Sequence, residues 1–181
     1  MKKLTIVASL VAAFGSVGMA QAASSGTITF NGELTANTCD VVVDGQTADA
    51  TVVLPTVGVN QLNSATKTAG DTGFVMALNN CSGTLQTASA FFEAGASVDS
   101  LTGRLKNLTG SASNVSLQLL DGSSTSQAII QAGNANQVMN TTYKDVSGGS
   151  TTLPYIVRYY AEAPTTAGTV ISNVVYSIQY Q

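Results

Sequence analysis

Apolar and polar residues alternate in one short run after another along this sequence, with the two-residue period of strands that bury one face. Clusters of Gly, Ser, Asn and Asp stand between the runs, and such clusters predict turns. The runs that predict strands cover residues 27–34, 40–44, 51–57, 73–81, 89–93, 115–120, 151–162 and 170–181. About seven to nine such strands in one chain predict an all-β fold, either a sandwich or a small barrel.

The alternation also predicts which side chains face the core, most clearly in the last run. Five apolar residues of that run fall on one face: Val170, Val174, Tyr176, Ile178 and Tyr180. One helical turn is expected near residues 60–65, and loops are expected at 82–87, 110–114 and 133–142. The sequence contains no internal repeat and no interdomain linker, so we expect a single domain.

The first residues have the three parts of a secretory signal. Lys2 and Lys3 are followed by an apolar run without charge, and Ala20-Gln21-Ala22 gives the small-x-small pattern of a cleavage site. The apolar run, residues 4–18, is shorter than the ~20 residues that a membrane-spanning helix needs. We therefore expect residues 1–22 to be removed before Ala23, which leaves 159 of the 181 residues for one exported domain.

Both cysteines, Cys39 and Cys81, lie in the exported part. An oxidising compartment makes one disulfide between them the default expectation. The bridge would close a loop of about 42 residues, for which the chain-entropy model gives ~4 kcal/mol of stabilisation. The chain has no histidine and no further cysteine, so the sequence predicts no metal site.

Charge and residue types argue against several functions. Without Lys2 and Lys3, five basic residues remain against ten acidic ones, a net charge of −5, and none of the basic residues cluster. Nucleic acid is therefore not an expected partner. The absence of histidine excludes Ser-His-Asp and Cys-His sites, and no phosphate-binding or dinucleotide motif occurs. We expect no catalytic residue, no cofactor and no enzymatic activity.

Several segments together resemble a known family. Residues 29–34 followed by Cys39, residues 73–81 ending in Cys81, and the blocks 114–121 and 153–161 match family segments in order and spacing. Tyr180 is the penultimate residue and Gly168 is fourteenth from the end, as in that family. Over essentially the whole exported chain, the sequence is similar to the major subunits of type 1 pili, which are assembled by the chaperone–usher route.

The resemblance implies a fold and a division of the chain. It implies an incomplete immunoglobulin-like β-sandwich, the pilin fold, that lacks its final strand. Residues 36–181 would form this domain, and residues 23–35 would be a donor strand that completes the neighbouring subunit. The donor face would consist of Ile28, Phe30, Gly32 and Leu34, with Gly32 allowing close approach to the groove floor.

The resemblance also implies partners and a location. Copies of the chain would join head to tail into a fimbria that supports cell adhesion, after contact with a periplasmic chaperone and an outer-membrane usher. The residues expected to line the groove and to be recognised by these two partners are Gly168, Val174, Tyr176, Ile178 and Tyr180. The exported chain would cross the periplasm, would not insert into a membrane, and would end on the cell surface.

Other functions remain open at the level of sequence. An eight-stranded outer-membrane barrel also has a signal and alternating strands, but the two cysteines, the 6% aromatic content and the final Gln181 argue against it. A minor or tip subunit could bind a glycan or receptor through surface loops. Tyr155, Tyr159 and Tyr160 would suit sugar stacking, although their strand periodicity favours packing. Residues 27–34 could also be the first strand of their own domain.

Overall fold

The structure is a computed structural model that describes residues 26–32, 34, 36 and 38–181. The predicted signal peptide, residues 1–22, lies outside the described residues. Contacts divide the chain into a unit Met1–Glu33 and a unit Leu34–Gln181. In the first unit, the described residues 26–32 form no helix or strand and are exposed. The fold described below is that of the second unit.

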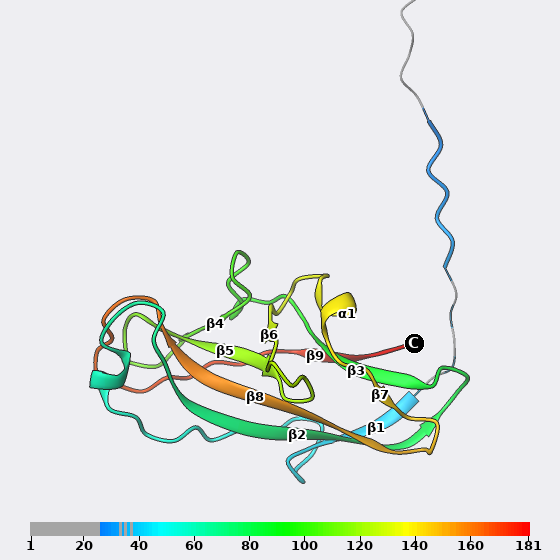
Figure 1. The fold of residues 1–181 in the computed structure, drawn as a ribbon, viewed down its shortest axis with the longest axis horizontal. Helices are drawn as coiled ribbons and strands as arrows, with labels where there is room; N and C mark the ends of the chain where they lie inside the picture. Colours follow the sequence, from blue (N-terminus) through cyan, green and yellow to red (C-terminus); the bar gives the residue numbers. More distant parts are fainter. Residues whose placement is uncertain (1–25, 33, 35, 37) are drawn as a thin grey trace, which may run out of the picture. The chain divides into compact units, whose positions relative to one another are not determined.

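Two antiparallel sheets form the second unit (Figure 1). The larger sheet has the order β1-β2-β8-β5-β4, and β6 pairs with β5. Its strands are β1 (Thr38–Val43), β2 (Thr68–Ser82), β8 (Thr151–Ala161), β5 (Val115–Asp121), β4 (Leu105–Lys106) and β6 (Ile129–Ile130). The smaller sheet has the order β7-β3-β9, formed by β7 (Lys144–Asp145), β3 (Thr87–Phe92) and β9 (Tyr176–Tyr180). The nine strands of the described residues agree with the predicted number.

The hydrophobic core lies between the two sheets and follows from the alternation of the strands. The longest strands, β2 and β8, pair along most of their length and turn one apolar face inward. The ring of Tyr155 on β8 packs edge-on against Phe92 at 5.1 Å and at a tilt against Phe74 at 5.7 Å. Tyr155 is therefore a core residue. On the outer face, Tyr160 is covered by the Arg104 guanidinium, 4.0 Å from its ring centroid.

One edge of β3 is completed by side chains where the short β7 ends. The Ala90 N–H donates to the Tyr155 hydroxyl (2.9 Å), and the Phe92 N–H donates to Gln137 Oε1 (3.0 Å). Gln137 begins α1 (Gln137–Asn140), and its side chain is buried. These bonds satisfy backbone donors that would otherwise be buried without a partner.

Three local predictions were wrong or incomplete. Residues 51–57 form no strand, because Pro55 has no N–H and no described backbone group pairs with this segment. In the run 170–181, only Tyr176–Tyr180 belongs to a sheet. The loop predicted at 133–142 contains the short helix α1. By contrast, the single helical turn expected near residues 60–65 is present as a 3₁₀ helix, η1 (Val59–Leu62).

No helix within the described part of the chain is long and apolar enough to cross a membrane.

Candidate functional site

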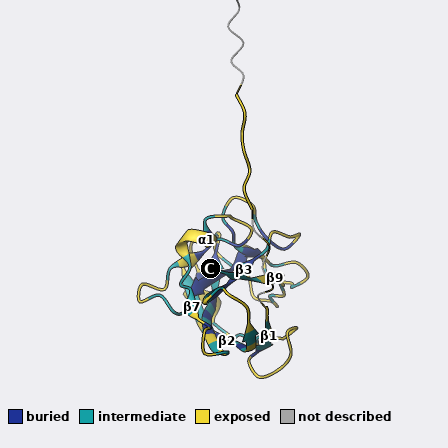
Figure 2. Ribbon diagram, turned by 90° about the vertical axis from the view of Figure 1, so that its right-hand side faces the viewer, coloured by how far each residue is buried: buried dark blue, intermediate teal, exposed yellow. Residues whose placement is uncertain are grey.

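Two strands at the same side of the sandwich each have only one neighbour. β1 pairs with β2 alone, and β9 pairs with β3 alone. Figure 2, which looks along the strands, shows β9 at the outer edge of one layer and β1 at the outer edge of the other. Both edges therefore present backbone N–H and C=O groups to which a further strand could pair.

The segment that leads into β9 extends its open edge. The carbonyl groups of Thr169, Ile171 and Val175 accept hydrogen bonds from the backbone of residues 112, 108 and 93. Backbone groups of successive residues in an extended chain point to opposite sides. The backbone N–H and C=O groups of the even-numbered residues from 170 to 180 therefore point to the other side, toward β1, where a further strand could pair with them.

Between these edges lies a groove that reaches the core. Its deepest part is a cavity of about 450 Å³, here called the deep cavity. The floor is apolar and comes from both sheets, including Phe74, Met76, Phe92, Leu119 and Val157. A sandwich normally fills this space with its own side chains at the density of a protein interior. Here the core is open on one side.

Two further cavities continue the groove along β9. The open cavity, about 600 Å³, lies between Cys39–Val41 on β1 and Tyr176–Ile178 on β9. A smaller cavity of about 170 Å³ follows beside Cys39, Cys81 and Tyr180. Because neighbouring cavities share lining residues, the three form one groove between β1 and β9.

Two tyrosines of β9 cross the groove. The Tyr176 hydroxyl donates to the Ala48 carbonyl at 2.8 Å. Burial raises the pKa of Tyr176, and the nearby Asp49 carboxylate adds to this effect. Burial also raises the pKa of Tyr180, while a hydrogen bond with the Cys39 backbone opposes it. The hydroxyl groups are therefore tied to the opposite side of the groove.

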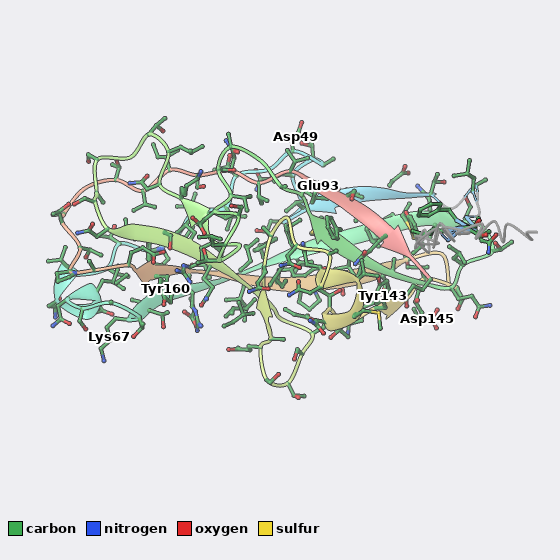
Figure 3. The ribbon with its side chains drawn as sticks, turned by 90° about the horizontal axis from the view of Figure 1, so that it is seen from above. Asp49, Lys67, Glu93, Tyr143, Asp145 and Tyr160 are labelled. Atoms are coloured by element: carbon green, nitrogen blue, oxygen red, sulfur yellow. A yellow bond between two sulfur atoms is a disulfide. The ribbon has the colours of Figure 1, made fainter. Side chains whose placement is uncertain are left out.

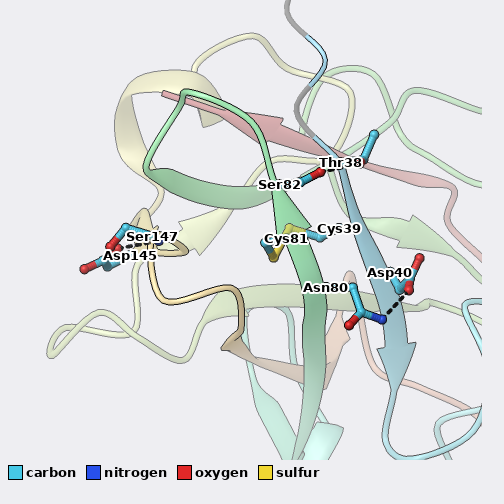
Figure 4. The surroundings of a disulfide bond; sticks show 8 residues. All are labelled: Thr38, Cys39, Asp40, Asn80, Cys81, Ser82, Asp145 and Ser147. Atoms are coloured by element: carbon cyan, nitrogen blue, oxygen red, sulfur yellow. Dashed lines mark hydrogen bonds between the residues drawn. A yellow bond between two sulfur atoms is a disulfide. The ribbon is translucent and has the colours of Figure 1, made fainter.

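The disulfide anchors β1, the strand that forms one wall of the groove. Cys39 and Cys81 are bonded across a sequence separation of 42 residues, as predicted (Figure 4). On either side of the bond, Asn80 Nδ2 donates to Asp40 Oδ2 at 2.8 Å, and the Thr38 and Ser82 hydroxyls lie 3.3 Å apart. Since β1 has a single neighbour, these contacts fix the wall at its free end.

Described by itself, the N-terminal segment carries an exposed apolar face. The side chains of Ile28, Phe30 and Leu34 are 77%, 88% and 101% exposed. They occur at alternate positions with Gly32 between Phe30 and Leu34, and therefore fall on one side of an extended chain.

Of the five residues predicted to line the groove, all but Gly168 do so. Val174 and Tyr176 line the deep cavity, Ile178 lines the open cavity, and Tyr180 lines the smallest one. Gly168 lies elsewhere: a Cβ at this position would overlap the backbone nitrogen of Ala112 and the Ser111 side chain. Its glycine is explained by the close packing of two loops.

Sequence reasoning missed three groups of groove residues. Val52 and Leu54 line the deep cavity from the run 51–57, for which Pro55 suited an edge or a bend. Ser172 also lines it, and its buried hydroxyl has no hydrogen-bond partner in the described structure. Ala48 and Asp49 lie in a polar loop without any pattern. Of these residues, only Val52 and Leu54 could have been found from the sequence, because they occupy alternate apolar positions beside Pro55.

The residues that the structure describes contain no group of three or more His, Cys, Asp or Glu side chains that could hold a metal ion. The groove walls are apolar or carry backbone groups, and this arrangement suits the binding of an extended polypeptide.

Comparisons by sequence give consistent relatives. The family described as "FimA: Type-1 fimbrial protein, A" matches residues 54–181. The chain is 37% identical to an F17 fimbrial protein of Escherichia coli, with all of both chains covered. It is 41% identical to the major fimbrial subunit SMF-1 of Stenotrophomonas maltophilia (strain K279a), over 90% of this chain and 96% of that one.

Comparisons by structure agree on the fold. A subunit from a structure of a chaperone–usher pilus superposes with a TM-score of 0.60 at 16% identity, covering 88% of this chain and 97% of the other. The P pilus rod subunit PapA gives 0.55 at 18% identity, covering 79% and 99%. At these identities the likeness concerns the fold, and it confirms the prediction of an incomplete immunoglobulin-like sandwich.

Proposed function

Because the chain belongs to the family of type-1 fimbrial proteins, we propose that it is the repeating structural subunit of a bacterial fimbria. The subunits polymerise by donor-strand exchange into the shaft, which supports adhesion, and the proposal assigns the chain no catalytic step. One observation carries the proposal: the sandwich has a groove to its core between two strand edges that lack a partner.

The occupant of the groove is the N-terminal segment of a neighbouring copy. Ile28, Phe30 and Leu34 enter the cavities while the donor backbone pairs with β1 and β9. Burying three large apolar side chains at ~1.5–3 kcal/mol each gives roughly 5–9 kcal/mol before the cost of ordering the segment. Gly32 leaves room where the donor passes close to the groove floor.

This mode of binding is β-strand addition, and it produces a filament. Each subunit offers a donor segment and a groove, so the contact is heterologous and does not close on itself. Residues 23–35 act as the donor extension and residues 36–181 as the receiving domain.

The open groove also explains the need for assembly partners. An unpaired apolar groove invites aggregation, so a periplasmic chaperone fills it until the subunit reaches an outer-membrane usher. The groove-edge residues Val174, Tyr176, Ile178 and Tyr180 make these contacts. Residues 1–22 direct export and are removed, and the assembled fimbria is extracellular.

Donor-strand exchange is tested with a variant that starts at Ala36 and a synthetic peptide of residues 24–35. The peptide should raise the melting temperature strongly, and the gain should reverse slowly because a full backbone ladder must break. A Phe30→Asp peptide should give no gain. The matched control is Asn31→Asp, which puts the same charge on the opposite face of the strand and should retain the effect.

The outcome separates the proposed function from its alternative. A variant that is folded, stable and indifferent to the peptide would be a self-contained sandwich. In that case residues 27–34 would be an ordinary strand, and a subunit that binds a glycan through its loops would become the better hypothesis.

A further inference from the structure

A loop that follows β1 reaches across the groove. Residues 44–51, here called the 44–51 loop, begin with Asp44 and Gly45, whose φ angles of 48° and 69° turn the chain sharply. Asp44 holds the base of the loop on β2: its N–H donates to the Val75 carbonyl at 2.9 Å, and its Oδ1 accepts from the Val75 N–H at 2.7 Å. The loop is thus hinged at the wall of the groove formed by β1.

Two backbone bonds also tie the loop to the end of β1, from the Val43 N–H to the Thr47 carbonyl at 3.1 Å and from the Gln46 N–H to the Val43 carbonyl at 2.9 Å, and three further bonds are internal. The Gln46 side chain donates to the Thr51 carbonyl at 3.1 Å and accepts from the Thr51 N–H at 3.2 Å. The Thr47 hydroxyl donates to the Asp49 carbonyl at 2.5 Å. All residues from 44 to 51 are exposed, so little apolar burial holds the loop in place. Such a segment belongs to the least stable part of a fold.

One bond joins the tip of the loop to the opposite wall. This is the hydrogen bond from the Tyr176 hydroxyl on β9 to the Ala48 carbonyl, 2.8 Å long. Asp49, the next residue (labelled in Figure 3), lies near Tyr176, whose pKa its carboxylate helps to raise. Ala48, Asp49 and Tyr176 line both the deep cavity and the open cavity. They therefore stand where the two cavities meet, in the middle of the groove.

We propose that the 44–51 loop is a lid over the middle of the groove, that the Tyr176–Ala48 hydrogen bond holds it shut, and that the lid controls entry to the groove. This rests on the proposed function for the identity of the entering strand. A strand lying between β1 and β9 must pass the place where this bond crosses. The bond breaks and the loop swings about Asp44 and Gly45 when a strand enters.

The strength of the latch suits a gate that delays entry without preventing it. A neutral hydrogen bond with one face open to water contributes little net free energy, equivalent to roughly a two- to tenfold change in an opening equilibrium. An empty groove is closed most of the time and opens spontaneously. Chance pairing with the edges of the wrong chain is reduced, while a donor segment held nearby still enters.

Lid opening is measured with a thiol in the deep cavity. Ser172 lines that cavity and its oxygen is buried, so the exported chain with Ser172→Cys and its native disulfide intact carries a reporter beneath the lid. The rate of labelling by a maleimide reports how often the groove opens. Adding Tyr176→Phe keeps the ring and removes only the latch hydroxyl, and it should raise the labelling rate about two- to tenfold.

A matched control removes a hydroxyl elsewhere. Tyr159 on β8 is half-buried against the core and lines none of the three groove cavities. Tyr159→Phe should leave the labelling rate unchanged. In case Ser172→Cys fails to fold, the association rate of a fluorescent peptide of residues 24–35 is measured on the otherwise unaltered exported chain. It should rise by the same factor with Tyr176→Phe.

The results distinguish the lid from the donor strand. Faster labelling together with faster peptide association supports both the lid and the entry of a donor strand. Faster labelling without peptide binding in any variant supports the lid and refutes the proposed function. Equal or slower labelling with Tyr176→Phe overturns the lid, because the hydroxyl would then have no effect on opening or would favour it.

Discussion

The side-chain cap on β3 allows a quantitative prediction about Gln137. Its side chain is 1% exposed and bonds both backbone groups of Phe92: Oε1 accepts from the N–H, and Nε2 donates to the carbonyl, each at 3.0 Å. Gln137→Met keeps the length and volume of the side chain but removes these bonds. The substitution therefore isolates hydrogen bonding from cavity formation.

The expected loss follows from which groups remain without a partner. The Phe92 carbonyl keeps the hydrogen bond from the Gly133 N–H at 2.8 Å. The Phe92 N–H keeps nothing, because β7 ends before this position. Leaving one buried donor unpaired costs roughly 1–3 kcal/mol. We expect the free energy of unfolding to fall by about 2 kcal/mol, or about 4–8 °C in melting temperature for a chain of this size.

Urea unfolding followed by far-ultraviolet circular dichroism measures this loss. Both proteins carry the same concentration of donor peptide, because a bound strand adds to the apparent stability. The control is Met139→Gln, the reverse exchange of side chains two residues away, where Met139 is 83% exposed. It should stay within about 0.5 kcal/mol of the unaltered chain. A loss below 0.5 kcal/mol for Gln137→Met, or an equal loss in the control, would refute the reasoning.

Two further predictions concern an ion pair and the disulfide. Burial raises the pKa of Glu162. Hydrogen bonds donated by Arg104 Nε at 2.8 Å and by the Ser116 hydroxyl at 2.6 Å outweigh this effect, so the pKa lies below the ordinary 4.5. A carboxyl group whose pKa is lower in the folded state contributes stability above pH 4.5, and this stability is lost as the pH falls through the folded pKa. Glu162→Gln should therefore make the unfolding free energy decline less steeply below pH 4.5. Equal slopes for the two proteins in urea titrations would contradict this. Replacing Cys39 and Cys81 by Ser opens the loop of 42 residues and should lower the unfolding free energy by about 4 kcal/mol. Reduction of the unaltered protein should give the same loss, and a loss below about 1 kcal/mol would contradict the loop-closure argument.

The alternation of the sequence predicted the faces of the long strands correctly. Phe74, Met76 and Leu78 on β2 are buried, and so are Tyr155 and Val157 on β8. Facing is a local property, because a period of two residues decides it within a single strand. For the same reason, Val174, Tyr176, Ile178 and Tyr180 could be assigned to one face before their neighbours were known.

Features that depend on distant partners left no such pattern. Gln137 caps β3 from a helix within a loop rich in Asn, where no apolar period marks a helix. The Tyr176–Ala48 bond joins residues 128 positions apart. Gly168 was assigned to the groove by family resemblance, whereas the packing of residue 168 against residues 111 and 112 explains the glycine.

The alternating pattern at the C-terminal end begins before strand β9. Val170, Ser172 and Val174 continue the inward face of β9, although this part of the chain lies outside the sheet. Across the groove, Val52 and Leu54 likewise turn toward the deep cavity from a segment that pairs with no described backbone group. The four apolar side chains of these two segments pack against the core but stay only partly buried. Two segments patterned as strands therefore flank the position of an absent one. This supports completion of the sandwich by a strand from another copy, because a strand is the element that can pair with both edges and fill the cavity.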